Sequence, residues 1–149
     1  MLVITSLPCL AEKLVPQRPP MLIVDQLIER LPDRAMTESI VPEDGIWVDA
    51  DQGVLPEYYI ELIAQTMAAV NGYDALCQGK TPQDGFLVGV DTFCWQEKAV
   101  SGEHLWVEVE KTFEFGAVKI FRGVVRNGAQ VKATGEIKVW EGDTSAGGN

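Results

Sequence analysis

With 22 acidic and 12 basic residues, the 149-residue chain carries a formal net charge of −10. This charge argues against nucleic acid or an anionic membrane surface as a partner, because contact with phosphates requires a basic surface. The content of 46% hydrophobic and 23% charged residues is that of a globular protein, and the length fits a single domain over residues 1–149. The sequence has no apolar run of the roughly 18 residues that a membrane span needs. Its first residues lack the features of an export signal, so we expect a cytoplasmic protein.

Two strands are predicted in the first third of the chain. Residues 1–15 form a lead-in, and residues 21–31, which follow two prolines, are predicted to form the first strand. After a turn that contains proline and aspartate, residues 35–41 alternate as a second strand does. Residues 42–54 are rich in aspartate and glycine and form a loop, which is a common location for functional groups beside a rigid element.

Residues 55–72 are predicted to form one central helix. Pro56 suits the first helical turn, where a missing N–H costs no hydrogen bond, and Asn71-Gly72 predicts the end of the helix. Apolar side chains cover nearly the whole circumference, which is typical of a buried helix. These side chains are Ile60, Leu62, Ile63, Ala64, Met67, Ala68, Ala69 and Val70.

One narrow polar stripe interrupts this apolar surface. Glu57, Glu61 and Gln65 follow one another at intervals of four residues, so they share one side of the helix. A carboxylate is rarely buried without a partner or a role, and burial moves its pKa upward toward the range of acid–base catalysis. The stripe therefore contains the candidate catalytic residues.

Strands are predicted for most of the second half of the chain. Residues 86–95 begin with a continuous apolar run, which is typical of a strand covered on both faces, and Gly89 within it indicates the close approach of another backbone or a ligand. Residues 105–115 and 117–126 form the next two strands. Asn127-Gly128 predicts a tight hairpin.

The last strand, residues 130–139, alternates cleanly between an apolar and a polar face. Residues 143–149 are predicted to be a frayed tail. The order of elements predicts an α+β architecture in which a curled antiparallel sheet wraps one central helix. The doubly covered strand at residues 86–95 suggests a dimer.

Four motifs resemble one known family in the same order along the chain. Residues 16–25, Pro-Gln-Arg-Pro-Pro-Met-Leu-Ile-Val-Asp, are similar to an opening Pro-His-Arg…Leu-Leu-Val-Asp segment, and residues 60–65 contain a Glu-x-x-x-Gln motif. Residues 86–91 resemble the strand after the helix, and residues 102–110 resemble a Gly-Asp-x-Leu-x-x-Glu-Val-Glu turn and strand. The family is that of the 3-hydroxyacyl-(acyl carrier protein) dehydratases, which have the hotdog fold.

This resemblance implies a homodimer or heterodimer of hotdog subunits, with active sites between protomers. It also implies the dehydration of a 3-hydroxyacyl thioester carried on a phosphopantetheine arm. In the family, a histidine on the loop before the helix acts with a carboxylate on the helix, since one group removes the C2 proton and another expels the 3-hydroxyl group.

The resemblance assigns the helix carboxylate to Glu61 but leaves the histidine unmatched. Residues 45–53, Gly-Ile-Trp-Val-Asp-Ala-Asp-Gln-Gly, replace the family's His-Phe-Pro-Gly loop, and Gln17 replaces the histidine of the opening motif. His104 is the one histidine of the chain, and its position predicts an exposed turn residue. The sequence therefore resembles a divergent branch of the family.

We expect a dehydratase in which Glu61 is the main acid–base group, assisted by Asp49, Asp51 or Glu57. Two carboxyl groups in one apolar site can separate their pKa values and so provide an acid and a base. The candidate substrate-binding residues are Gln65, Gly89, Phe86, Trp47 and Tyr58.

The sequence leaves two alternatives open. Hotdog thioesterases use a helix or loop carboxylate and need no histidine, so an acyl-CoA or acyl-carrier-protein thioesterase is the first. A non-catalytic subunit that binds acyl chains or pairs with a complete hotdog subunit is the second.

The expected partner is an acyl carrier protein or a coenzyme A thioester, with a dimer as the basic unit. Because a carrier protein is acidic, docking requires a basic patch, for which the candidates are Lys98, Lys119, Arg122, Lys132 and Arg18. The three cysteines, Cys9, Cys77 and Cys94, fit neither a disulfide framework nor a zinc motif. We expect no metal and no cofactor.

Overall fold

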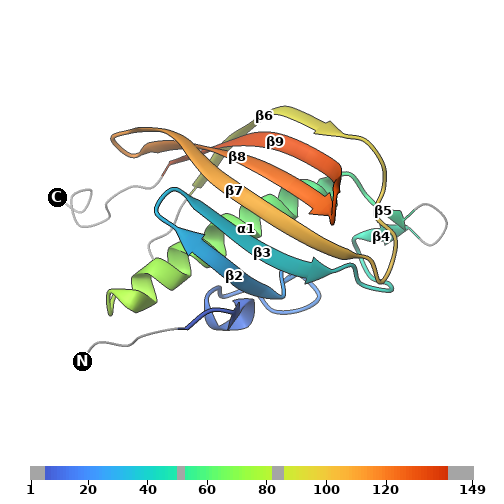
Figure 1. The fold of residues 1–149 in the computed structure, drawn as a ribbon, viewed down its shortest axis with the longest axis horizontal. Helices are drawn as coiled ribbons and strands as arrows, with labels where there is room; N and C mark the ends of the chain where they lie inside the picture. The colour runs from blue at the N-terminus through green and yellow to red at the C-terminus, as the bar shows by residue number, and fades with distance from the viewer. Residues whose placement is uncertain (1–5, 50–52, 82–85, 141–149) are drawn as a thin grey trace.

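A large antiparallel sheet curls around one long helix, which crosses a face of the sheet (Figure 1). The computed structural model describes residues 6–49, 53–81 and 86–140, with only the main chain at residues 86–88. Within these residues the main sheet has seven strands in the order β1-β2-β3-β7-β8-β9-β6, and β4 and β5 form a separate hairpin. The elements are β1 (Cys9–Leu10), η1 (Ala11–Lys13), β2 (Gln26–Leu31), β3 (Arg34–Ile40), β4 (Val48–Asp49), β5 (Gly53–Val54), α1 (Glu57–Cys77), β6 (Phe86–Trp95), β7 (His104–Phe115), β8 (Val118–Asn127) and β9 (Gln130–Trp140). None of the helices in these residues is both long and apolar enough to cross a membrane.

The helix α1 is longer than predicted, and the predicted end at Asn71-Gly72 is wrong. Gly72 lies inside the helix and is buried. A Cβ atom at this position would come within 1.9 Å of the main-chain oxygen of Leu14. Glycine is needed here because the lead-in segment crosses the helix at close range, and not because the helix ends.

The sheet packs its apolar face onto α1. In β7 the buried residues Leu105, Val107 and Val109 alternate with more exposed ones, as expected for a strand with one face on the core. Gly123 of β8 allows close packing, because a Cβ atom there would lie 2.6 Å from a methyl carbon of Ile63. The core thus extends along the helix from its first turn.

Two buried threonines join the helix to the sheet within this apolar contact. Thr37 of β3 and Thr66 of α1 are fully buried and share a hydrogen bond of 2.7 Å. The Thr66 hydroxyl also donates to the main-chain oxygen of Leu62 at 2.8 Å. The pairing satisfies both hydroxyl groups, so it fixes the helix on the sheet without leaving an unpaired polar atom.

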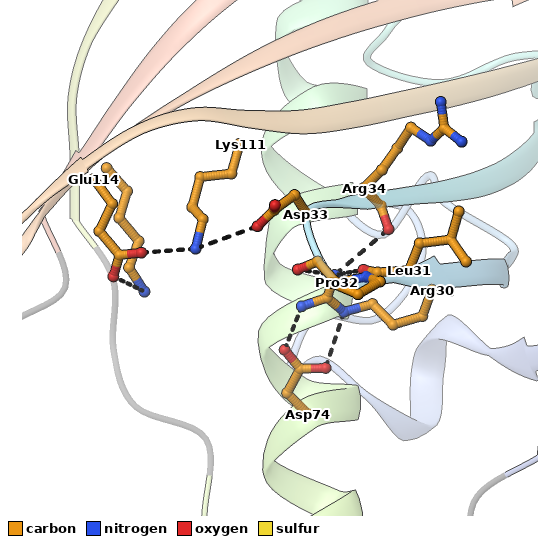
Figure 2. A network of polar contacts seen from close by, with 9 residues as sticks. Arg30, Leu31, Pro32, Asp33, Arg34, Asp74, Lys111 and Glu114 are labelled. Carbon is orange, nitrogen blue, oxygen red and sulfur yellow. Dashed lines mark hydrogen bonds and ion pairs between the residues drawn. The ribbon is translucent and has the colours of Figure 1, made fainter.

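An ion pair ties the last turns of α1 to the β2–β3 hairpin (Figure 2). Arg30 donates from Nε to Asp74 Oδ1 at 3.0 Å and from Nη2 to Asp74 Oδ2 at 2.8 Å. The same guanidinium group reaches the main-chain oxygen of Arg34, whose own guanidinium points away from the network (Figure 2). A two-point contact of this kind fixes orientation as well as distance.

The first predicted strand is only half right. Residues 26–31 form β2, but residues 21–25 are not part of the sheet. The main chain at Met21 and Ile23 is hydrogen-bonded to the side chain of Gln65 on α1. The polar groups that would otherwise pair with a neighbouring strand are therefore used by the helix.

The predicted strand at residues 86–95 is confirmed as β6, but the described part of the chain does not cover it on both faces. It is the terminal strand of the sheet, and Val90 and Trp95 are 38% and 40% exposed. At Gly89, an added Cβ atom would meet nothing within 4 Å. The close approach that Gly89 predicts is therefore not made by the described part of the chain.

The last three strands agree with the sequence except at Lys132. The β8–β9 hairpin turns after Asn127, as predicted. Lys132 was expected on the polar face, but it is 5% exposed. The strand pairing moves from Ala133 opposite Val125 to Val131 opposite Arg126, so Lys132 is the extra residue of a β-bulge. A bulge reverses the local alternation and directs this side chain inward.

Candidate active site

Gln65 holds the segment before β2 against the helix. This side chain is 2% exposed. Its Oε1 atom accepts hydrogen bonds from the main-chain N–H groups of Ile23 at 2.8 Å and Val24 at 3.4 Å. Its Nε2 atom donates to the main-chain oxygen of Met21 at 2.8 Å and to Glu61 Oε1 at 2.9 Å. All of its hydrogen-bonding capacity is therefore used, and the amide has one fixed orientation.

The carboxylate of Glu61 is oriented by this amide. Glu61 is half-buried and lies one helical turn before Gln65. Because the donor is itself immobilised by the main chain of another segment, the carboxylate has a defined direction at the junction of the helix and residues 21–24. A half-buried, oriented carboxylate can accept a proton from a bound molecule and return it.

The other predicted acidic residues do not join Glu61. Glu57 is exposed in the first turn of α1, and Asp49 is exposed on β4. Asp51 lies outside the described residues. The predicted polar stripe therefore runs from solvent at Glu57 to the core at Gln65, and Glu61 stands at the boundary.

Tyr58 and Trp47 form an aromatic pair next to this site. Tyr58 is fully buried, and its ring meets the ring of Trp47 edge to face with centroids 6.2 Å apart. Among the described residues, neither the Tyr58 hydroxyl nor the Trp47 Nε1 atom has a hydrogen-bond partner, although both atoms are buried. Burial raises the pKa of Tyr58 well above its usual range, and the charge of Asp25 adds to the rise. The phenol therefore stays protonated.

A cavity of about 160 Å³ opens beside Trp47. The other residues around it are mostly apolar or proline, and they come from the segment before β2 and from the loop after β3. They are Pro19, Pro20, Leu22, Ile23, Asp25, Ile40, Pro42, Asp44, Gly45 and Ile46. The cavity is therefore enclosed by the same segment that Gln65 fixes and by the loop that leads into the helix.

Asp25 lines this cavity, as Asp44 does, and sequence reasoning missed it as a site residue. Its Oδ2 atom accepts a hydrogen bond from the main-chain N–H of Ile40 at 2.8 Å. Partial burial of the carboxyl group raises the pKa of Asp25 above its ordinary value of 3.8, and the charge of Glu38 contributes in the same direction. The sequence feature that could have identified Asp25 as a site residue is its place at the end of the Leu-Ile-Val-Asp motif.

His104 lies on the other face of the sheet. It is the first residue of β7, its side chain is 43% exposed, and its Nε2 atom is 3.1 Å from Glu38 Oε2. Its ring stacks on Trp106 with centroids 4.2 Å apart. The neighbouring Leu105 faces the core, so His104 points away from it. His104 is exposed, as predicted.

The remaining predicted binding residues lie elsewhere. Phe86 and Gly89 belong to β6, at the opposite edge of the sheet from β2. Lys132, a predicted docking residue, is buried between Glu97 at 2.9 Å and Glu103 at 3.1 Å. Its ammonium group is therefore not available to a partner protein.

A single helix wrapped by a curled antiparallel sheet defines a hotdog protein, and in this chain the helix carboxylate Glu61 lies at the edge of the core. The dehydratase heterocomplex ApeI:P from Xenorhabdus doucetiae has this fold, with a TM-score of 0.80 and 19% identity over 95% of each chain. A hypothetical thioesterase from Streptococcus pneumoniae, solved with coenzyme A, also shares it, with a TM-score of 0.64 and 8% identity over 78% of this chain and 84% of that one.

Sequence comparison gives the family. The ApeP-like family, described as ApeP dehydratase, matches residues 9–147. The 3-hydroxyacyl-[acyl-carrier-protein] dehydratase FabZ of Anaeromyxobacter sp. (strain K) is 30% identical over 135 residues, which are 85% of this chain and 84% of the relative. The chain belongs to the ApeP-like dehydratase family. The predicted hotdog fold and the predicted resemblance to 3-hydroxyacyl-(acyl carrier protein) dehydratases are both confirmed.

Proposed function

We propose that this protein dehydrates 3-hydroxyacyl thioesters carried on the phosphopantetheine arm of an acyl carrier protein, and that Glu61 transfers the proton. The observation that supports this most is the hydrogen bond from Gln65 to Glu61, since Gln65 is anchored to Met21, Ile23 and Val24. The similarity to a FabZ that acts on 3-hydroxyacyl-acyl-carrier-protein supports the choice of substrate class.

The reaction can be balanced with this carboxylate alone. The C2 proton of a 3-hydroxyacyl thioester is acidic because the adjacent carbonyl group stabilises the carbanion. Glu61 removes that proton, and the C2–C3 double bond forms as the C3–O bond breaks. The protonated Glu61 then gives the same proton to the departing hydroxyl group, which leaves as water. One carboxyl group acts as base and then as acid, so the step needs no histidine.

A second hotdog subunit is part of this proposal. The outer edge of β6 carries no strand among the described residues, and Val90 and Trp95 on this strand are more than one-third exposed. An open edge strand with apolar residues pairs readily with another chain. Because the ApeI:P structure is described as a heterocomplex, the partner is either a second copy of this chain or a related hotdog subunit.

The carrier protein requires basic residues near the entrance to the site. Of the predicted candidates, Arg18 and Arg122 are exposed. Lys119 lies 4.0 Å from Glu114 and lines a cavity near the Arg30–Asp74 pair, at the far end of α1. Arg18 follows Gln17 in the segment that precedes the Gln65 contact, so we propose Arg18 as the first docking residue to test.

The products of the reaction distinguish dehydration from the thioesterase alternative. The purified protein is incubated with a 3-hydroxyacyl-carrier thioester and, separately, with a saturated acyl thioester. The proposal expects an enoyl thioester from the first substrate and no free thiol from either. Release of free thiol without an enoyl product would replace the proposal with hydrolysis.

A further inference from the structure

Two adjacent tyrosines of α1 differ in how their hydroxyl groups are paired. Both side chains are fully buried. The Tyr59 hydroxyl donates to the main-chain oxygen of Glu97 at 2.7 Å and accepts from the main-chain N–H of Ala99 at 2.7 Å. The Tyr58 hydroxyl has no partner in the described part of the chain. A buried hydroxyl group without a partner destabilises a protein, so phenylalanine would suit position 58 better if packing were its whole role.

Trp47 repeats this pattern on the neighbouring loop. Its Nε1 atom is buried and unpaired among the described residues, and its ring is in edge-to-face contact with Tyr58. Trp47 lines the cavity together with Ile23 and Asp25. Two donors that lack an acceptor among the described residues therefore belong to one aromatic pair, of which Trp47 lines the cavity and Tyr58 packs against Trp47.

Their position relative to Glu61 matters for the reaction. Tyr58 precedes Glu61 by three residues on α1, so the two side chains lie on the same side of the helix. The Gln65 contact fixes Glu61 beside residues 21–24, and Ile23 from this segment lines the cavity. Catalysis assisted by this pair requires a substrate whose C2 atom is at Glu61 to place its carbonyl group toward Trp47 and Tyr58.

We propose that the Tyr58 hydroxyl and the Trp47 N–H donate hydrogen bonds to the carbonyl oxygen of the acyl thioester. This inference rests on the proposed dehydration, in which negative charge develops on that oxygen when Glu61 removes the C2 proton. Buried donors that are already in place stabilise such charge strongly, because they need no reorganisation during the reaction.

The chemistry of the cavity favours a neutral carbonyl over an anionic ligand. An indole N–H can only donate a hydrogen bond, and the pKa of Tyr58 is raised, so its hydroxyl also remains able to donate. Asp25 lines the same cavity, and its carboxylate repels a bound phosphate or carboxylate. The two donors therefore suit an oxygen that is uncharged in the ground state and gains charge only during the reaction.

The test compares Tyr58→Phe and Trp47→Phe with the matched control Tyr59→Phe. Removal of one such donor lowers kcat by about 100-fold, and we expect this loss for Tyr58→Phe with little change in KM. The thermal midpoint of Tyr58→Phe stays equal to that of the wild type or rises, because no existing hydrogen bond is lost. Tyr59→Phe gives the opposite result, a lower midpoint with nearly unchanged kcat. Wild-type kcat in both Tyr58→Phe and Trp47→Phe would overturn the proposal.

A spectroscopic measurement separates this proposal from the proposed reaction. In Glu61→Gln, a thioester with a ¹³C-labelled carbonyl group is bound, and its infrared stretching frequency is compared with that in water-free solvent. We expect a lower frequency in the complex, and a return toward the solvent value when Tyr58→Phe or Trp47→Phe is added. If these frequency changes are seen but the wild type forms no enoyl product, the proposed dehydration is refuted and the assignment of the two hydrogen-bond donors stands. A frequency that neither added substitution changes would refute the donor pair, whether or not the wild type is active.

Discussion

Gln65 donates a hydrogen bond to Glu61 at 2.9 Å while its own amide oxygen accepts the main-chain N–H of Ile23 at 2.8 Å. One side chain thus connects the packing of the chain to the direction of the candidate catalytic carboxylate. The segment before β2 is attached to α1 by this amide, so the wall of the cavity and the position of Glu61 depend on the same contact.

Gln65→Leu is expected to lower stability and activity together. The substitution keeps the volume of the side chain but leaves the buried N–H of Ile23 and the oxygen of Met21 without partners. Unpaired buried groups of this kind cost about 1–3 kcal/mol, and urea denaturation measures the change in the free energy of unfolding. Gln78→Leu, at an exposed position after α1, is the control and should stay within about 0.5 kcal/mol of the wild type. Equal stability of the two variants would refute the role of the Gln65 contact.

Gly72→Ala is expected to be destabilising although alanine favours helices. Alanine gains about 1 kcal/mol over glycine inside a helix. At Gly72, however, the new Cβ atom would lie 1.9 Å from the main-chain oxygen of Leu14. Backbone displacement of this kind costs about 1–3 kcal/mol or more, so the clash prevails. Thermal unfolding should show a lower midpoint for Gly72→Ala and a nearly unchanged one for Gly89→Ala, where nothing lies within 4 Å. A raised midpoint for Gly72→Ala would show that the lead-in segment does not hold this position.

The buried ion pair at the bulge predicts a loss of stability in acid. Burial acts to raise the pKa of Glu103, but hydrogen bonds from Asn127, the Val100 N–H and Lys132 prevail and hold it below the ordinary value of 4.5. A carboxyl group with a lowered folded-state pKa stabilises the fold above its unfolded-state pKa. This contribution is lost as the pH falls from about 4.5 through the folded-state value.

Glu103→Gln should therefore flatten the decrease in stability below pH 4.5. Urea midpoints between pH 3 and pH 7 measure this effect, and the exposed carboxyl variant Glu12→Gln is the control. An acid-induced decrease that is the same in Glu103→Gln and the wild type would contradict the assigned role of Glu103.

Features that depend on local chemistry were predictable from the sequence. Asn127-Gly128 determines its hairpin through the turn type that it favours, and the spacing of Glu61 and Gln65 places them one turn apart on any helix. The apolar character of residues 55–72 also predicts a central helix. These features led to the correct fold and family.

Features that depend on distant contacts were not predictable. Glycine is required at position 72 because the main-chain oxygen of Leu14 lies against it. Leu14 is distant in sequence, so the helix sequence gives no sign of this contact. The inward turn of Lys132 comes from the bulge in the pairing of β8 with β9, which the regular alternation of the β9 sequence does not reveal. The unpaired state of the Tyr58 hydroxyl is a property of its surroundings, since the adjacent Tyr59 has the same chemistry and is fully paired.

The role of Glu61 in proton transfer is tested by the rate of enoyl formation from a 3-hydroxyacyl-carrier thioester by the wild type, Glu61→Gln and Glu57→Gln. Both substitutions remove one carboxylate from the same helix, but only Glu61 is held by Gln65, while Glu57 is exposed. We expect Glu61→Gln to lower kcat by at least about 100-fold, the usual range for loss of an acid–base group, and Glu57→Gln to retain nearly full activity. A Glu61→Gln variant that forms the enoyl product at the wild-type rate would contradict the assignment of Glu61 as the proton-transfer group.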